Sequence, residues 1–159
     1  MAGRWTPTAT VAAVIERDGR FLLVEEETSE GLRLNNPAGH LDPGESLCEG
    51  AAREALEETG WPFRPRALVG VYLLRVRDPH GGDLTYLRFA FCGDLLDGEP
   101  RRPLDSGIVR TLWLTADQVR ATAERHRSPL VMRCVEDYLA GQRIALSAIH
   151  TDPSVSSRG

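Results

Sequence analysis

The segment from Gly39 to Trp61, GHLDPGESLCEGAAREALEETGW, restricts the fold more than any other part of the chain. Ser46 followed by Glu49 is a capping-box pattern, which predicts that a helix begins here. Gly60 is typical of the residue that follows the last helical turn. A helix is therefore expected over residues 46–60, with both of its ends fixed by local sequence.

The expected helix has one side of mostly small residues and a neighbouring side of glutamates. At about 3.6 residues per turn, the residues that share the first side are Cys48, Ala51, Ala52, Ala55, Leu56 and Thr59. Side chains of this size let a helix approach a sheet closely. Glu54, Glu57 and Glu58 project from an adjoining arc of roughly 100°, although like charges three or four residues apart weaken a helix.

This group of carboxylates has a functional and a structural interpretation. Hard divalent cations such as Mg²⁺ bind oxygen ligands of this kind, so the group predicts a metal site. Alternatively, Glu49, Arg53 and Glu57 lie four residues apart and form a solvated salt-bridge stripe. The stripe accounts for Glu49, but it does not account for Glu54 and Glu58, which repel each other and have no cation four residues away.

The rest of the chain predicts a β-rich domain. Strands are expected in the two arms of residues 10–27, which flank the turn Asp18-Gly19, in 68–78 and 83–96, which flank a second turn, and in 109–114. Residues 34–46 are expected to be a loop. We expect a single domain over residues 1–150 and a disordered tail over 151–159.

Two further helices are expected towards the C-terminus. Thr115 with Gln118 repeats the capping-box pattern. Ser128-Pro129 places a capping residue before a proline at the first helical position. The helix after it has an apolar stripe at Val131, Cys134, Val135 and Tyr138 and is expected to end at Gly141.

Composition excludes several classes of function. The absence of lysine rules out a phosphate-loop or Schiff-base lysine, and three scattered cysteines argue against a disulfide framework or a zinc site. A net charge of −4 argues against a nucleic-acid partner. The sequence has neither a membrane-spanning apolar run nor a signal-peptide pattern, so we expect a cytoplasmic protein without a membrane partner, as a monomer or small homo-oligomer.

The acidic segment resembles the Nudix box, GX5EX7REUXEEXGU, in which U is a bulky apolar residue. The residues that match are Gly39, Glu45, Arg53, Glu54, Glu57, Glu58 and Gly60, and Trp61 fills the last apolar place. Ala55 is the one departure, since it is smaller than the pattern prefers. The resemblance implies an α+β protein with the Nudix fold, an α/β/α sandwich around a mixed sheet. It also implies hydrolysis of a small-molecule phosphoanhydride substrate with Mg²⁺, or with Mn²⁺.

Site residues carried over from this resemblance fall into three groups. Glu54, Glu57 and Glu58 are implied metal ligands, joined by a backbone carbonyl near Gly39. Glu45 and Arg53 are implied to lie next to these ligands and to fix the loop to the helix. Glu57 is our choice for the general base, followed by Glu58, and Arg53 is counted with them among the catalytic residues.

Four further residues are expected to bind substrate, namely His40, Tyr86, Arg88 and Asp105, although each has an ordinary structural alternative. Tyr86 and Arg88 share one face of their strand, and Phe89 and Phe91 share the other, so one pair is core and the sequence leaves open which. His40 is either a ligand contact or a plain loop histidine. Asp105 is either a late acidic ligand or base, or a loop aspartate before a strand.

Five phrases resemble the NudJ-type phosphatases more narrowly: FLLVEE, NPAGHLDPGE, LRFAF, RSPLV and YLAGQR. That subgroup hydrolyses nucleoside tri- and diphosphates and the diphosphate of the thiamine pyrimidine precursor, and it tends to release orthophosphate. The alternatives are a Nudix enzyme that cleans the nucleotide pool or cleaves dinucleoside polyphosphates or ADP-ribose, and a nucleotide-binding Nudix domain without activity.

Overall fold

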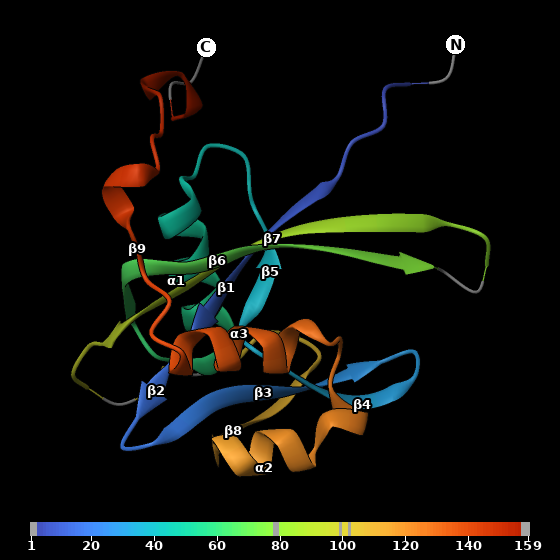
Figure 1. Cartoon of the computed structure of the whole chain (residues 1–159), viewed down its shortest axis with the longest axis vertical. Coiled ribbons are helices and arrows are strands. Elements are labelled where there is room, and N and C mark those ends of the chain that lie inside the picture. Colours follow the sequence, from blue (N-terminus) through green and yellow to red (C-terminus); the bar gives the residue numbers. More distant parts are fainter. Residues whose placement is uncertain (1–2, 78–79, 99, 102, 157–159) are drawn as a thin grey trace.

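The chain forms a mixed sheet system with helices on both sides, as a computed structural model of residues 3–77, 80–98, 100–101 and 103–156 describes (Figure 1). One sheet has the order β5-β1-β7-β6-β9, built from Ala38–His40, Thr8–Val14, Asp83–Leu95, Phe63–Arg77 and Ile144–Ala145. The other centres on β3 (Arg20–Thr28), which pairs with β2 (Glu16–Arg17), β4 (Gly31–Asn35) and β8 (Ile108–Thr115). Because β1 and β7 are parallel and the other pairs are antiparallel, the predicted α+β class with a mixed sheet is confirmed.

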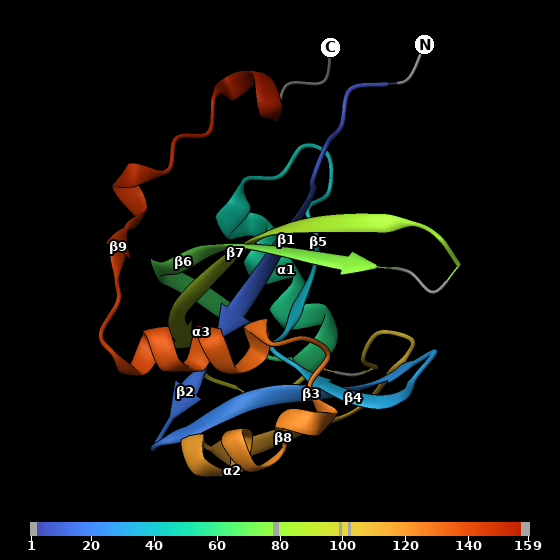
Figure 2. The ribbon, with the colours of Figure 1, turned by 45° about the vertical axis from the view of Figure 1, so that its right-hand side comes forward.

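In the described ranges, three α-helices cover these strands: α1 (Leu47–Thr59), α2 (Ala116–Ala121) and α3 (Leu130–Leu139). Helix α1 lies on one face of β1 and β6, and α3 lies across the opposite face (Figures 1 and 2). Short 3-10 turns occur at Ala123–Arg125, Leu146–Ala148 and Pro153–Val155. Two apolar clusters result, one between α1 and the sheet around Phe91, and the other beneath α3 around Phe21.

Helix α1 begins and ends where its sequence predicts. The Ser46 hydroxyl accepts a hydrogen bond from the Glu49 amide at 3.1 Å, and the Glu49 carboxylate accepts one from the Ser46 amide at 2.9 Å. Gly60 ends the helix with a φ of 78°, in the left-handed region that glycine adopts without steric cost.

The buried side of α1 differs from the predicted one. Ala51 and Ala55 are fully buried, as expected, but Ala52 and Leu56 are only partly buried. Glu54 and Glu58 occupy the buried positions instead. These two carboxylates therefore do not lie on a solvent-facing flank, but between the helix and the sheet.

The first hairpin is shorter than predicted. Asp18 and Gly19 both have positive φ and form a two-residue turn, but this turn joins only β2 to β3. Strand β1 pairs instead with β5 and β7 of the other sheet. Residues 11–15 are all buried, as expected for a strand that is covered on both faces. The predicted loop over 34–46 also contains the end of β4 and all of β5.

Smaller differences concern the later elements. Strand β6 begins at Phe63, five residues before the predicted start, because it extends to the end of its partner β7 at Leu95. The pairing of Arg77 with Asp83 agrees with a second hairpin, although Pro79 in its turn lies outside the described residues. Helix α3 begins at Leu130, whose amide donates to the Ser128 hydroxyl at 3.2 Å.

The tail predicted to be disordered contains the turn at Pro153–Val155, while residues 157–159 lie outside the described part. The domain boundary at residue 150 stays a prediction. Within the described ranges, none of the helices combines the length and apolar character needed to cross a bilayer.

Candidate metal and phosphate site

Three carboxylates from two distant parts of the chain meet beside α1. Glu54, Glu57 and Asp105 each offer an oxygen, and these atoms lie within 4.8 Å of one another. Asp105 comes from the connection between β7 and β8, and its amide donates to the Glu57 carbonyl at 2.9 Å. Of the two alternatives for Asp105, the structure supports a position in the acidic site.

Gly39 provides the space into which Glu54 fits. It lies in β5 opposite Val11 of β1, so its backbone position is fixed by strand pairing. A β-carbon at this residue would overlap the carboxyl carbon of Glu54 and lie 2.5 Å from Oε2. The glycine that opens the acidic segment therefore allows the carboxylate to lie directly against the backbone, a close approach that any larger residue would prevent.

Glu58 is not one of the three clustered carboxylates. Its Oε1 accepts a hydrogen bond from the Ala38 amide at 2.8 Å, and only 7% of the residue is exposed. Burial raises its pKa to about 8 against the opposing effect of that hydrogen bond, and the nearby charges of Glu54, Glu26 and Asp105 add to the increase. Glu58 thus joins α1 to β5 at the edge of the site.

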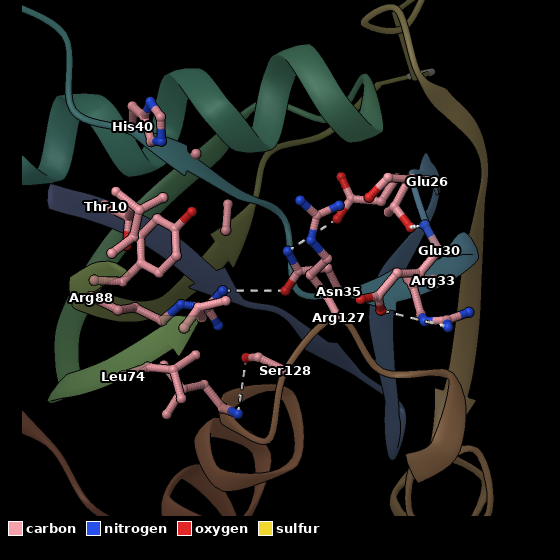
Figure 3. A pocket seen from close by; sticks show the side chains of 18 of the residues that line it. Thr10, Glu26, Glu30, Arg33, Asn35, His40, Leu74, Arg88, Arg127 and Ser128 are labelled. Carbon is pink, nitrogen blue, oxygen red and sulfur yellow. Dashed lines mark hydrogen bonds and ion pairs between the residues drawn. The ribbon is translucent and has the colours of Figure 1, made fainter. Parts of the chain in front are cut away.

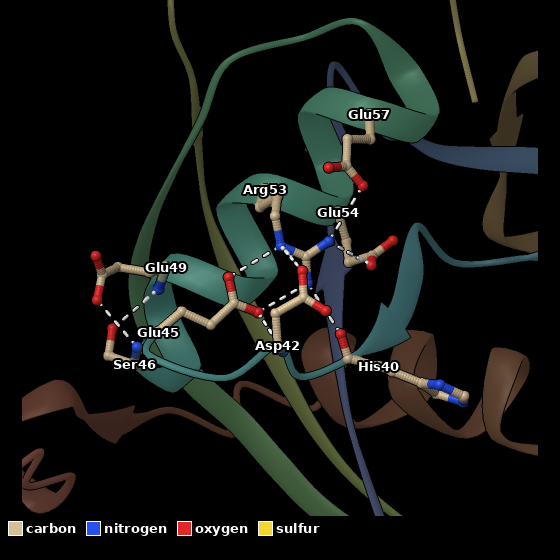
Figure 4. A network of polar contacts seen from close by, with 8 residues as sticks. All are labelled: His40, Asp42, Glu45, Ser46, Glu49, Arg53, Glu54 and Glu57. Carbon is tan, nitrogen blue, oxygen red and sulfur yellow. Dashed lines mark hydrogen bonds and ion pairs between the residues drawn. The ribbon is translucent and has the colours of Figure 1, made fainter. Parts of the chain in front are cut away.

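Arg53 holds the acidic residues together (Figure 4). Its guanidinium donates to both oxygens of Glu45 at 2.7 and 2.9 Å, to Glu54 at 2.7 Å and to Glu57 at 3.1 Å. It also donates to the His40 carbonyl at 2.9 Å. The hydrogen bonds from Arg53 hold the pKa of Glu45 below its usual value.

The predicted salt-bridge stripe of Glu49, Arg53 and Glu57 is therefore correct for the pair of Arg53 with Glu57 and wrong for the pair of Arg53 with Glu49. Arg53 contacts Glu57 but, within the described part of the chain, makes no ion pair with Glu49, whose carboxylate is used in the capping box. The guanidinium turns instead towards the loop before the helix, where Glu45 offers two oxygens in the fork geometry that arginine prefers.

A cleft of about 440 Å³ lies beside the acidic site (Figure 3). Its lining includes Ala38, whose amide donates to Glu58, and Gly39, which lies against Glu54. His40, Tyr86 and Arg88 all line it, which places three of the expected binding residues on one cavity. Glu26, Asn35 and Arg127 line it as well. Phe91, on the opposite face of β7 from Arg88, is fully buried in the core beneath α1.

Arg88 is a buried cation, and the sequence left open whether its side chain faces the core or the cleft. Only 7% of it is exposed, and its guanidinium donates to the side-chain oxygens of Asn36 at 3.0 Å and Asn35 at 3.2 Å. Among the described residues it forms no ion pair with a carboxylate. Because a buried cation is costly without a compensating anion, this position favours a ligand that carries hydrogen-bond acceptors or negative charge.

Sequence reasoning missed the residues that connect Arg88 to the acidic site. Asn35 donates to Glu26 at 3.2 Å while accepting from Arg88, and Glu26 is close enough to raise the pKa of Glu58. The run of three glutamates at the end of β3 gives no signal that Glu26 faces a cleft. The adjacent amides of Asn35 and Asn36 before Pro37 are the one local hint.

We expect the raised pKa of Glu58 to make the metal-free protein less stable as pH rises. Glu58 titrates near 8 when folded and near 4.5 when unfolded, so between these values the folded state holds more protons. The free energy of unfolding should therefore fall by on the order of a few kcal/mol from about pH 4.5 to pH 8. Urea unfolding in EDTA measures this, and Glu58→Gln should reduce the fall. An equal fall in both proteins would contradict the assignment to Glu58.

The chain is similar to known proteins over most of its length. A family model for the NUDIX domain matches residues 5–134. The proteins named phosphatase NudJ from Escherichia coli K12 and Shigella flexneri are 39% identical over 144 residues, which cover 90% of this chain and 90% of each relative. A solved NUDIX hydrolase from Nitrosomonas europaea is 48% identical with a TM-score of 0.84, over 92% of this chain and 98% of that one. A MutT NUDIX hydrolase from Burkholderia pseudomallei, at 22% identity and a TM-score of 0.69 over 84% of this chain and 98% of that one, supports the fold alone.

Proposed function

This chain belongs to the Nudix family of hydrolases, and we propose that it cleaves phosphoanhydride bonds with a divalent cation held by Glu54, Glu57 and Asp105. The observation that carries the proposal is the approach of these three carboxylates to within 4.8 Å beside an arginine-containing cleft. Three negative charges this close would repel a phosphate chain unless a cation lay between them.

The donor set fits Mg²⁺ or Mn²⁺. Carboxylate oxygens are the ligands that hard divalent cations prefer, and the space at Gly39 keeps one of them against the backbone. Such an ion, when bound, neutralises phosphate oxygens and lowers the pKa of water. A carbonyl ligand at Gly39 and a fourth carboxylate ligand at Glu58 are further parts of the proposal.

The roles of the chain's own groups follow from their surroundings. Arg53 and Glu45 keep the carboxylates of Glu54 and Glu57 in fixed positions, which removes the cost of ordering them during reaction. The side chain of Glu57 is 40% exposed, against 11% for that of Glu54, so water reaches Glu57 more easily than Glu54. We assign Glu57 as the general base, which takes the proton from the attacking water at a carboxylate oxygen.

The cleft binds the remainder of the substrate in this proposal. Arg88 is fixed by two asparagine side chains and offers its guanidinium to an acceptor group, while Tyr86 and His40 line the same cavity. The similarity to proteins named phosphatase NudJ supports a phosphatase activity. We propose that this chain releases orthophosphate from nucleoside tri- and diphosphates or from a thiamine-pathway pyrimidine diphosphate. We expect the site to bind the substrate mainly through its phosphate groups. A site of this kind cannot distinguish one nucleobase from another, so its preference among nucleobases should be weak.

Hydrolysis in ¹⁸O-labelled water tests this function. With Mg²⁺, a nucleoside triphosphate should give labelled orthophosphate, and the diphosphate should accumulate before the monophosphate appears. EDTA should abolish the reaction. Pyrophosphate as the first product, or strong preference for one base, would move the enzyme to the nucleotide-cleaning alternative, and full activity in EDTA would contradict the metal site.

A further inference from the structure

Asp105 reaches the acidic site through a connection that is attached to the end of α1. In the described part of this connection, two backbone hydrogen bonds join it to the end of α1. The Arg101 amide donates to the Gly60 carbonyl at 2.6 Å, and the Asp105 amide donates to the Glu57 carbonyl at 2.9 Å. The last carbonyls of a helix have no partner within the helix, so this connection supplies two of the missing partners at the end of α1.

Gly60 is in close contact with this connection as well as ending the helix. A β-carbon built on Gly60 would overlap the carbonyl oxygen of Arg101 and lie 2.9 Å from its amide nitrogen and 3.2 Å from its carbonyl carbon. All three are backbone atoms, so rotation of a side chain cannot relieve the contact. Any residue larger than glycine at this position must push the Arg101 backbone away from α1.

Gly141, beside the end of α3, shows that a glycine in this conformation does not in itself require such contact. Its φ of 83° is close to the 78° of Gly60, so both positions disfavour a β-carbon equally on conformational grounds. A β-carbon on Gly141 would meet no atom within 4 Å. A larger residue would therefore be equally strained at either position. The two glycines differ in that the Arg101 backbone lies against Gly60, whereas no atom lies within 4 Å of a β-carbon on Gly141.

We propose that Gly60 is a positioning residue for the acidic site: by admitting the Arg101 backbone against the end of α1, it brings the Asp105 carboxylate to Glu54 and Glu57. This inference rests on the proposed function, since it assigns Asp105 to the metal-binding group. Pro103 lies between the two attachment points, and its ring restricts the backbone there. In this proposal, a displacement at Arg101 alters the position of Asp105, which lies four residues further along the same connection.

Metal binding without turnover tests the proposal, using Mn²⁺ titrated into the metal-free protein by calorimetry. Gly60→Ala should weaken Mn²⁺ binding by about tenfold, the lower end of the effect expected when the support of a metal ligand is removed. Gly141→Ala, the matched control, should bind Mn²⁺ as the wild type does. Urea unfolding of both variants separates loss of affinity from loss of fold.

A double-mutant cycle with Asp105→Asn distinguishes positioning from a general structural effect. If Gly60 acts through Asp105, then Gly60→Ala should add little to the loss that Asp105→Asn already causes. Arg101→Pro removes the amide that donates to Gly60 and should weaken Mn²⁺ binding in the same way, without altering α1.

The possible outcomes separate this inference from the proposed function. Wild-type affinity in both Gly60→Ala and Arg101→Pro, or full additivity with Asp105→Asn, would overturn the inference and leave the proposed function standing. A wild-type protein that binds no Mn²⁺ would overturn both. Failure of Gly60→Ala to fold leaves Arg101→Pro to decide the question by its own affinity.

Discussion

Replacing Glu54 by glutamine is expected to lower turnover about a thousandfold, which corresponds to ~4 kcal/mol of transition-state stabilisation. Glu54 is 8% exposed and lies between Arg53, Gly39 and the other two clustered carboxylates. Burial raises its pKa against the opposing effect of Arg53, so a neutral side chain is tolerated there in the absence of metal. The fold should survive, because a glutamine oxygen can still accept the hydrogen bond from Arg53.

The matched control is Glu49→Gln, which makes the same change of charge on the same helix. Glu49 accepts a hydrogen bond from the Ser46 amide, which a glutamine oxygen can also accept, and it is not in the acidic site. Steady-state hydrolysis with saturating Mg²⁺ should therefore be nearly unchanged in Glu49→Gln. Similar losses in the two variants, or normal turnover in Glu54→Gln, would contradict the placement of the metal site.

Elements that are specified by neighbouring residues were predicted well from the sequence. The boundaries of α1 follow from Ser46, Glu49 and Gly60, which act within one turn of the helix and need no tertiary contact. The spacing of Gly39, Arg53 and the glutamates is equally local. For that reason the family, the fold and the acidic helix could all be inferred from the amino-acid sequence alone.

Pairings between distant segments could not be predicted in the same way. The turn at Asp18-Gly19 suggested that β1 pairs with β3, but β1 forms its ladders with β5 and β7, which lie far along the chain. The prediction of the buried side of α1 was wrong for a related reason. Helical periodicity treats Glu54 as polar and therefore exposed, whereas Arg53 and the gap at Gly39 stabilise it in a buried position.

The lining of the cleft could be predicted only in part, because the sequence did not indicate which face of β7 is the core. Alternation along β7 correctly separated Arg88 from Phe91, but either face could have been the core. Arg88 is in fact almost as buried as Phe91, and what distinguishes them is the pair of asparagine oxygens around the guanidinium. Hydrogen-bond partners of this kind come from β4 and the residue after it, which sequence pattern alone did not connect to β7.

Replacing Gly39 by alanine is expected to lower turnover at least about a hundredfold, although the substitution adds only one methyl group. The new β-carbon would occupy the space of the Glu54 carboxyl group, and withdrawal of β5 would break the pairing of Gly39 with Val11 of β1. Glu54 must therefore move, and a displacement of about 1 Å in a reacting group can cost a hundredfold in rate. Hydrolysis rates as a function of Mg²⁺ concentration measure the effect.

Shortening the displaced side chain provides the control for this cause. Glu54→Asp removes one methylene and leaves room for the alanine methyl, so Gly39→Ala with Glu54→Asp should be more active than the sum of the two single losses predicts. Urea unfolding should show that each variant remains folded. If Gly39→Ala has wild-type turnover, or if the two losses simply add, then contact between Gly39 and Glu54 does not set the geometry of the acidic site.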